Sequence, residues 1–356
     1  MDDQKSVSMR DIARLAGVSI ATVSRVINNN GRFSEETRER VQRIIDENGY
    51  VTNMAAKSLR EQRSKTIGMI VPDISNDFFS TLALRAEQEL AREGYSVFVC
   101  NTANSTNRER TYIRTLVSKR VDGILCISGS NVLAEESIPK SIPVVCVDRF
   151  PGTDSNVPRV ISDDVNGGHL ATQHLIERGC RHILVISSAC DDLNKRNREK
   201  GYRQALEMHD LAVDPAYRVL LPGDEPSMVE TERLVTSFLT TGLPLDGIFA
   251  LSDHAALGAL RALKLAGIRS PEDVKIVGFD NSIYTLITTP SITTVRRFPQ
   301  TLASRGCEAL LSYIAGTRPP LEVVVPVELV ERDSTRGTFD SPMLKSQGPE
   351  ARRPEP

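Results

Sequence analysis

The strongest constraint on the fold is the alternation of strand-like and helix-like segments that begins at Thr66. The strand-like segments are short and apolar, whereas those between them repeat apolar residues at helical spacing. The predicted strands are TIGMIV from Thr66, YSVFVC from Tyr95, GILCI from Gly123, PVVCVD from Pro143, HILVIS from His182, GIFAL from Gly247 and VKIVGF from Val274. Predicted helices end at Gly94 (STLALRAEQELAREG) and Gly179 (HLATQHLIERG). Such alternation is typical of βαβ units and parallel sheets.

The length of this region predicts an α/β body with two halves. Residues 66–332 can hold two doubly wound parallel-sheet halves, with RVIS from Arg159 and SITTV from Ser291 as crossings between them. Sheets of this kind bind ligands beyond the carboxyl ends of their strands. Residues 333–356 are rich in proline and polar residues, and we expect a disordered tail there.

Residues 1–50 show a different pattern, with three short helices in close succession. The residues expected to face inward are Ile12, Leu15 and Ala16 in the first helix, Val23, Val26 and Ile27 in the second, and Val41, Ile44 and Ile45 in the third. Ser19 and Ser34 can cap the second and third helices, and Gly17 and Gly49 can end the first and third. The pattern predicts an all-α head, so the chain is multidomain.

The charge of the chain is unevenly distributed. The formal net charge is −2, but residues 1–65 hold 12 Lys and Arg against 9 Asp and Glu, and the remainder holds 32 against 37. A modestly basic head on an acidic body is compatible with contact between the head and nucleic-acid phosphates.

Several classes of protein are disfavoured by what the sequence lacks. It has no apolar stretch of signal-peptide or membrane-span length, so we expect a cytoplasmic protein without a membrane partner. The six cysteines include no C-x-x-C pair and the histidines lack zinc-ligand spacing, so we expect no metal and buried free thiols at Cys100, Cys126 and Cys146. No phosphate-binding glycine motif follows a strand and no catalytic triad is evident, which predicts no cofactor and no enzymatic activity.

The segment MRDIARLAGVSIATVSRVINN, which begins at Met9, resembles the helix-turn-helix of the lactose-repressor (LacI) family. The resemblance implies that the second helix lies in the major groove of DNA, with Ile20, Ala21 and Arg25 at base edges and Ser19, Thr22, Ser24 and Asn28 near phosphates. A guanidinium such as that of Arg25 can bind guanine in bidentate fashion, and Ile20 or Ala21 can pack on a thymine methyl group. The alternative is that Arg25 is an ordinary solvated arginine.

The next segment, ENGYVTNMAAKSLR, resembles the hinge of the same family, N-Y-x-x-N-x-x-A-x-x-L. We assign the hinge to residues 51–65. The resemblance implies that it folds on DNA, that Asn53 contacts DNA, and that Leu59 wedges into the minor groove. The alternative is a linker in which Leu59 packs on the body.

The body resembles the periplasmic sugar-binding fold that this family shares, and the resemblance extends over residues 8–332. The effector-binding residues that it implies are Asn76, Phe78 and Phe79 in SNDFF, Asp148 and Arg149 after PVVCV, Arg198 in NREKGY, Ser252 and Asp253 in SDHAALGAL, Asp280 in VGFDN, and Arg297. Aromatic faces combined with carboxylates and guanidinium groups suit sugars. The alternatives are core packing for the two phenylalanines and loop capping for Asp148 and Asp280.

Two positions depart from the family pattern. Ser252 replaces a usual asparagine, and Arg297 replaces a common glutamine. The site thus has one amide group fewer and one cation more than the family pattern, which suits an anionic effector such as a sugar phosphate or sugar acid. The alternative is that Arg297 points outward.

These observations predict a sequence-specific transcription regulator, a repressor that binds double-stranded operator DNA as a homodimer and is controlled by a sugar or sugar derivative. A transport-type sugar-binding protein would share the body but would not carry the helix-turn-helix. A phosphocarrier protein as co-effector is a further alternative, because SIATVSRV resembles the recognition segment of catabolite-control members of the family.

Overall fold

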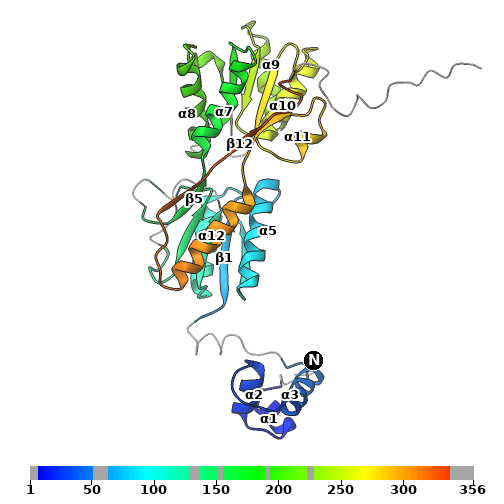
Figure 1. The fold of residues 1–356 in the computed structure, drawn as a ribbon, viewed down its shortest axis with the longest axis vertical. Helices are drawn as coiled ribbons and strands as arrows, with labels where there is room; N and C mark the ends of the chain where they lie inside the picture. The colour runs from blue at the N-terminus through cyan, green and yellow to red at the C-terminus, as the bar shows by residue number, and fades with distance from the viewer. Residues whose placement is uncertain are drawn as a thin grey trace, which may run out of the picture. The chain divides into compact units, whose positions relative to one another are not determined.

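The computed structural model describes residues 7–50, 63–127, 133, 137–150, 152, 155–188, 193–222 and 228–336. The chain forms two compact units, the head (residues 1–64) and the body (residues 65–356). In Figure 1 the head contains α1 to α3, and the body begins with β1. Asn53 and Leu59, which we predict to contact DNA, lie outside the described residues, as do residues 337–356 of the tail predicted from residue 333. The first residues of that tail belong to the folded body instead: Ser334 and Thr335 are 0% and 1% exposed, and the Ser334 hydroxyl donates to the carbonyl oxygen of Ile276 at 2.6 Å.

Three helices form the head: α1 (Met9–Ala16), α2 (Ile20–Ile27) and α3 (Glu35–Glu47). Each begins after a serine whose side chain accepts a hydrogen bond from the backbone N–H three residues later, and these serines are Ser8, Ser19 and Ser34. Gly17 ends α1 in the left-handed conformation, with φ of 62°. The predicted caps at Ser19 and Ser34 and the predicted helix end at Gly17 are confirmed.

The head has its own small hydrophobic core. Its buried members are Ile12, Ala13, Ala16, Val23, Val26 and Val41, against which Ile27, Ile44 and Ile45 pack while partly buried. Leu15 was expected to face inward, but it is 53% exposed. The prediction was wrong because Ala13, rather than Leu15, completes the inward stripe that the first helix forms with residues 12 and 16.

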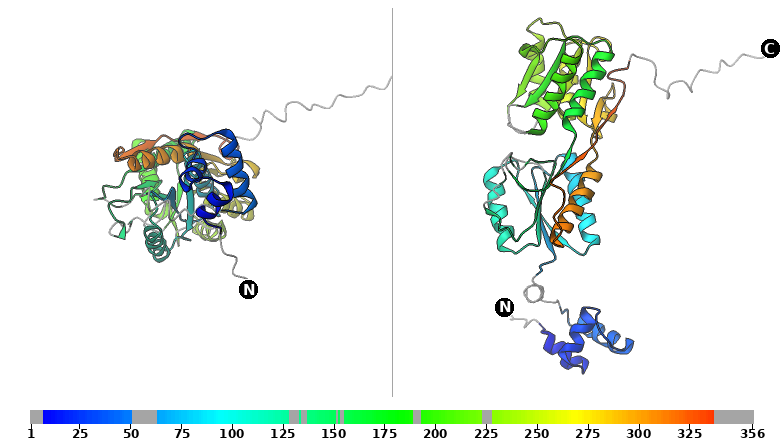
Figure 2. Two further views of the ribbon diagram at one scale, coloured as in Figure 1. Left: turned by 90° about the horizontal axis from the view of Figure 1, so that it is seen from below. Right: turned by 60° about the vertical axis from the view of Figure 1, so that its left-hand side comes forward.

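The body holds two six-stranded sheets, each with strands from distant parts of the chain (Figures 1 and 2). The first lobe has the order β11-β5-β4-β3-β1-β2, from β1 (Thr66–Val71), β2 (Ser96–Asn101), β3 (Gly123–Ile127), β4 (Val144–Val147), β5 (Arg159–Ser162) and β11 (Glu322–Val325). The second lobe has the order β12-β10-β9-β8-β6-β7, from β6 (Ile183–Ser188), β7 (Arg218–Leu221), β8 (Gly247–Ala250), β9 (Lys275–Asp280), β10 (Thr293–Arg296) and β12 (Glu328–Val330). All pairings are parallel except that of β12 with β10, so the second sheet is mixed at its edge rather than wholly parallel.

Helices cover both sheets. The first lobe carries α5 (Asp77–Arg92), α6 (Thr106–Ser118) and α12 (Pro299–Ile314). The second lobe carries α7 (Asp164–Glu177), α8 (Leu193–Met208), the short 3-10 helix η2 (Pro215–Tyr217), α9 (Met228–Leu239), α10 (Asp253–Leu265) and α11 (Tyr284–Ile287). The chain passes between the lobes after β5, after β10 and after β11. These three passages bring residues from distant parts of the sequence to the region between the lobes.

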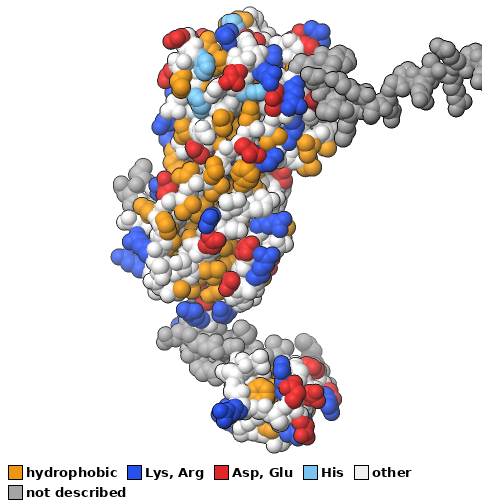
Figure 3. Space-filling model, viewed as in Figure 1, with side chains coloured by type: hydrophobic (Ala, Val, Ile, Leu, Met, Phe, Trp, Pro, Cys, Tyr) orange, Lys and Arg blue, Asp and Glu red, His pale blue; other side chains and the backbone are white. Residues whose placement is uncertain are grey.

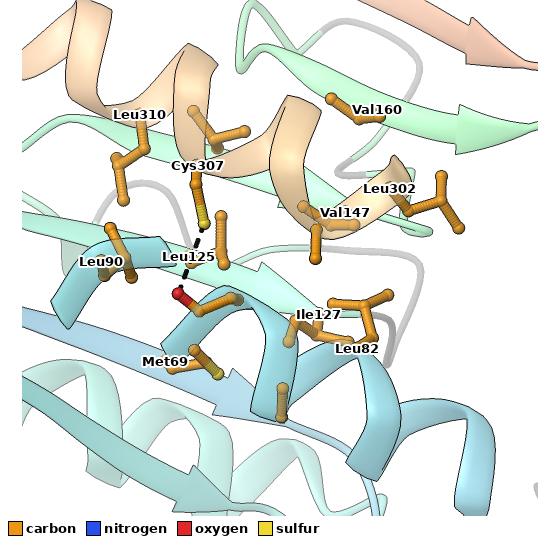
Figure 4. Packing of buried hydrophobic residues seen from close by; sticks show 14 of the residues in the cluster. Met69, Leu82, Leu90, Leu125, Ile127, Val147, Val160, Leu302, Cys307 and Leu310 are labelled. Atoms are coloured by element: carbon orange, nitrogen blue, oxygen red, sulfur yellow. Dashed lines mark hydrogen bonds between the residues drawn. The ribbon is translucent and has the colours of Figure 1, made fainter. Parts of the chain in front are cut away.

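The core of the first lobe lies between its sheet and the helices α5 and α12 (Figure 4). Met69, Leu125 and Val147 project from three strands toward Leu82 of α5 and Leu302 of α12, and all five side chains are fully buried. The Cys307 thiol donates a hydrogen bond of 3.6 Å to the carbonyl oxygen of Ala86, which ties α12 to α5. This packing fixes the carboxyl end of β4, where a predicted site residue follows.

The surface of the body carries charged and apolar side chains together, and its predicted buried cysteines are confirmed. Lys, Arg, Asp and Glu side chains are interspersed over the face seen in Figure 3, with apolar side chains between them. Cys100, Cys126 and Cys146 are buried free thiols, as predicted. Among the helices in the described part of the chain, none has the length and apolar character that a membrane span requires.

Candidate functional sites

The outer face of α2 presents the side chains predicted to read DNA bases. Val23 and Val26 of this helix are buried in the head, whereas Ile20, Ala21 and Arg25 are exposed on the other side. Ile20 is 44% exposed. The position of these three side chains fits contact with a DNA groove.

Arg25 extends over a glycine. A Cβ atom at Gly31 would lie 3.1 Å from Cδ of Arg25, and Gly31 has φ of +88°, so a glycine at this position suits both the turn and the arginine. Arg25 makes no ion pair with any other residue that the structure describes.

The polar residues of this segment make local hydrogen bonds. The Ser19 hydroxyl accepts from the backbone N–H of Thr22 and lies 2.9 Å from the Thr22 hydroxyl. The Asn28 amide donates to the carbonyl oxygen of Ser24 at 2.7 Å. These bonds stabilise both ends of α2, and phosphate contacts by the four residues remain a prediction.

In the body, two carboxylates occupy equivalent positions in the two lobes. Asp148 directly follows β4 and Asp280 ends β9, so each lies at the carboxyl end of a parallel strand. Their φ angles of 55° and 116° are positive, a conformation that is uncommon outside glycine and is concentrated at functional sites. Their positions match the place where open α/β sheets bind ligands.

Arg297 connects these two carboxylates. Its Nη1 donates to Oδ2 of Asp148 at 2.7 Å, and its Nε donates to Oδ1 of Asp280 at 2.9 Å. Its Nη2 lies 2.8 Å from the same Asp280 oxygen. The guanidinium carbon lies 3.4 Å from the ring centre of Phe78, and the residue is only 4% exposed. Arg297 thus points inward, and one buried guanidinium links the first lobe to the second.

Arg198 forms the other half of this arrangement. Its Nε donates to Oδ1 of Asp164 at 2.8 Å, its Nη1 donates to the carbonyl oxygen of Leu251 at 2.7 Å, and Nη1 also lies 3.8 Å from Oδ1 of Asp280. The guanidinium stacks on Phe279, 3.9 Å from the ring centre. We call Asp148, Asp164, Arg198, Asp280 and Arg297 the interlobe cluster.

Two helices of the second lobe approach closely enough to place Arg198 against Asp164. A Cβ atom at Gly168 of α7 would lie 1.9 Å from the carbonyl oxygen of Arg198, and one at Gly201 of α8 would lie 2.0 Å from that of Val165. Only glycine fits at both positions, because the obstructing atoms are backbone atoms.

Burial changes the acidity of two carboxyl groups at this site. Desolvation raises the pKa of Asp164 to about 6, opposed by the positive charge of Arg198. Desolvation, together with the negative charge of Asp280, raises the pKa of Asp253 to about 7. Asp253 accepts hydrogen bonds from the Thr294 hydroxyl at 2.6 Å and the Ser282 backbone N–H at 2.6 Å, which oppose the shift.

The other predicted effector residues lie near the cluster but have local partners. The side chain of Asn76 caps α5 through the N–H of Phe78, and Ser252 caps α10 through the N–H of Ala255. Phe79 packs edge-on against Phe78, with ring centres 5.5 Å apart. Phe78 itself belongs to the core of the first lobe and also receives Arg297, so the alternative of core packing applies to it in part.

Arg149 differs most from its predicted role. Both terminal nitrogens bind the carboxylate of Glu109 on α6, at 3.1 and 2.9 Å, and both side chains are buried within the first lobe. The structure thus pairs Arg149 with a helix of its own lobe, and an effector contact by Arg149 remains a prediction.

The sequence reasoning missed two residues of this region. Asp164 follows β5 at a passage between the lobes, so its position after a strand was an available signal. Asn194 donates to the carbonyl oxygen of Asp148 at 2.8 Å from the opposite lobe, and it precedes Arg198 by one helical turn. Two buried atoms here have no hydrogen-bond partner among the described residues, namely Asp164 Oδ2 and Ser162 Oγ.

A helix-turn-helix head and a two-lobed α/β body with a polar cluster between the lobes define a class of ligand-controlled DNA-binding proteins. The profile of bacterial regulatory proteins of the lacI family matches residues 8–53, and that of a periplasmic binding protein-like domain matches residues 172–335. The chain is 35% identical to a ribose operon repressor of Halalkalibacterium halodurans, over 94% of this chain and 98% of that protein.

Solved structures show the same architecture. A lac repressor dimer bound to operator and an anti-inducer matches with a TM-score of 0.83 and 24% identity, over 94% of this chain and 100% of that chain. A complex of the transcriptional regulator CelR with cellobiose matches with a TM-score of 0.70 and 29% identity, over 92% and 99%. The chain belongs to the LacI family of transcription regulators, which are DNA-binding repressors.

Proposed function

We propose that this repressor is released from or recruited to its operator by an uncharged polyhydroxy effector, a sugar, that binds between the two lobes. The interlobe cluster carries the proposal, because it brings carboxylates and guanidinium groups from both lobes together beside aromatic rings. Sugar hydroxyls donate to carboxylates and accept from guanidinium groups, and sugar faces pack on aromatic rings. Such hydroxyls would also satisfy the two unpartnered buried atoms at Ser162 and Asp164.

The charges of the site favour a neutral effector over an anionic one. The extra cation at Arg297 suggested an anionic effector in the sequence, but its guanidinium already binds Asp148 and Asp280. Both arginines of the cluster, Arg198 and Arg297, already have carboxylate partners. An anionic ligand would have to compete with Asp148, Asp164 and Asp280 for these guanidinium groups in a buried setting, where electrostatic interactions are strong.

The relatives support a sugar as the effector. One relative is named for a ribose operon, and a structural neighbour was solved with cellobiose bound. We therefore propose sugars rather than sugar phosphates or sugar acids as the first compounds to test.

The repressor is proposed to act as a cytoplasmic homodimer on a pseudo-palindromic operator. One short reading helix contacts too few bases for genomic specificity, whereas two related by a twofold axis double the site. Exposed apolar residues on the body offer surfaces for pairing: Phe98 (46% exposed) and Val99 (50%) on the edge strand β2, and Leu286 (55%) and Ile287 (72%) on α11. We expect the double variant Phe98→Asp/Ile287→Asp to sediment as a monomer at micromolar concentration, and an unchanged dimer would place the interface elsewhere.

Isothermal titration of the full chain with matched pairs tests the effector. The pairs are ribose with ribose 5-phosphate and glucose with glucose 6-phosphate, supplemented by cellobiose. We expect binding by a neutral member, which then changes the operator footprint. Tighter binding of a phosphate member would overturn the neutral-effector proposal. A phosphocarrier protein in the same series tests the co-effector alternative, which remains a prediction.

A further inference from the structure

The position of Arg297 in the chain gives it a role that neither lobe provides alone. It lies in the passage between β10 of the second lobe and α12 of the first. Its two carboxylate partners are fixed at strand ends in different lobes, Asp148 after β4 and Asp280 at the end of β9. A side chain in a connecting segment thus binds both of the parts that it connects.

The contacts of Arg297 are those expected of a bound ligand. Its donors face Asp148 at 2.7 Å and Asp280 at 2.8 and 2.9 Å, and its flat guanidinium lies 3.4 Å from the ring centre of Phe78. A sugar at the proposed site would use the same acceptors and the same ring face. A ligand and this guanidinium cannot occupy that space together.

We propose that Arg297 is a positioning residue that stands in for the effector and holds the lobes closed when no effector is bound. The inference rests on the proposed location of the effector site and adds how that site is regulated. An effector acts by displacing or rearranging Arg297, so it must supply hydrogen-bond donors to both carboxylates. Hydroxyl groups meet this requirement and anionic groups do not.

Loss of Arg297 changes the balance of forces between the lobes. Without it, the guanidinium shared by Asp148 and the partly buried Asp280 is lost, Asp280 keeps only the more distant Arg198 at 3.8 Å, and the two carboxylates repel each other. The hydrogen bond from Asn194 to the Asp148 carbonyl also spans the lobes, but it is a single bond without charge on either partner. We therefore expect the lobes of an Arg297→Gln variant to separate more often, while each lobe keeps its own core.

Hydrogen–deuterium exchange of the full chain without any ligand tests this. In Arg297→Gln, we expect amides at the three passages and at the ends of β4 and β9 to exchange about tenfold faster, with β1 and β8 unchanged. Arg297→Lys keeps the positive charge but loses the planar guanidinium group that reaches both carboxylates. Its exchange rates should lie between those of the wild type and Arg297→Gln. The control is Arg159→Gln, which removes an ion pair with Glu322 inside the first lobe and should affect only β5 and β11.

The outcomes separate this inference from the proposed function. Unchanged exchange at the passages in Arg297→Gln would overturn it, and so would a uniform increase through both lobes, which would make Arg297 merely structural. The exchange experiment contains no sugar, so its result does not depend on whether titration identifies the effector. Conversely, an effector found by titration does not by itself establish closure by Arg297.

Discussion

Arg25 is the exposed arginine of the reading helix, and its guanidinium has no ion-pair partner among the described residues. We expect Arg25→Ala to weaken operator binding by about 1–3 kcal/mol, because a bidentate contact with a base is lost. Binding to random duplex should change little, so specificity relaxes. Competitive fluorescence anisotropy with both duplexes measures the two effects.

Arg14→Ala is the matched control for this variant. Arg14 is also an exposed arginine of the head, but it lies on α1 and pairs with Asp11 at 3.1 Å. Its loss should not alter the preference for operator over random duplex. If Arg25→Ala weakened binding to both duplexes equally, Arg25 would be a phosphate contact instead.

Asp253 makes the stability of the body depend on pH. Its pKa is raised to about 7 by burial, whereas the unfolded chain titrates near the ordinary value of 3.8. The folded state therefore holds a proton that the unfolded state releases, and the associated stability is present at low pH and lost as pH rises toward 7. We expect the melting temperature of the wild type to fall between pH 5 and 8 by more than that of Asp253→Asn, measured by circular dichroism.

Asp273→Asn is the control for the pH experiment. Its salt bridge with Arg269 lowers the pKa of Asp273 to about 2, below the range tested. This variant should keep the pH dependence of the wild type between pH 5 and 8. Equal pH dependence in Asp253→Asn and the wild type would show that Asp253 is charged throughout this range.

At the level of single residues, the sequence predicted which strand-end carboxylates lie at the interlobe cluster better than it predicted their contacts. Asp148 and Asp280 were predictable because they follow apolar strands, whose carboxyl ends meet ligands in this fold. The pairing of Arg149 was not predictable, because its partner Glu109 lies 40 residues earlier on a helix that only the packing of the lobe brings near. The contacts of Arg297 with two carboxylates likewise depend on the packing of both lobes, and the local sequence does not reveal them.

At the level of elements, the close approach of α7 and α8 positions Arg198. We expect Gly201→Ala to destabilise the body by about 1–3 kcal/mol, because the new methyl group would meet the Val165 carbonyl oxygen at 2.0 Å and force the helices apart. Separation of these helices also moves Arg198 away from Asp164, so sugar affinity should fall as well. Urea unfolding and isothermal titration measure the two effects.

Lys200→Ala tests whether the loss of stability in Gly201→Ala is specific to the contact between α7 and α8. Lys200 is the exposed neighbour of Gly201 on the same helix, and its replacement should change stability by less than about 0.5 kcal/mol. Wild-type stability in Gly201→Ala would mean that the two helices can separate without cost.

Among the strands, those that the sequence did not predict are short and lie at sheet edges. The central strands β1 and β3 have the predicted bounds because both are continuous apolar runs buried on both faces. β7, β11 and β12 contain only three or four residues and were missed. Their pairing depends on partners far along the chain, as with β11 and β5, and local pattern carries no information about such partners.

At the level of the whole molecule, the distribution of charge matches the different roles proposed for the head and the body. The excess of positive charge lies in residues 1–65, with 12 basic against 9 acidic residues, and the body is acidic. Phosphate attracts the first and repels the second, so we expect DNA contact to be confined to the head and the hinge.

DNA and effector are proposed to bind to different units of the chain, and we expect their binding to be coupled. A ligand shifts a conformational equilibrium only through different affinities for the two states. If the sugar changes operator affinity by a given factor, operator DNA must change sugar affinity by the same factor, on the order of 5- to 150-fold for a coupling of about 1–3 kcal/mol. We therefore expect the dissociation constant of the sugar identified by titration to differ by that factor between free and operator-bound protein. Random duplex of equal length is the control, and an identical sugar affinity in the presence and absence of operator would mean that the interlobe site does not control DNA binding.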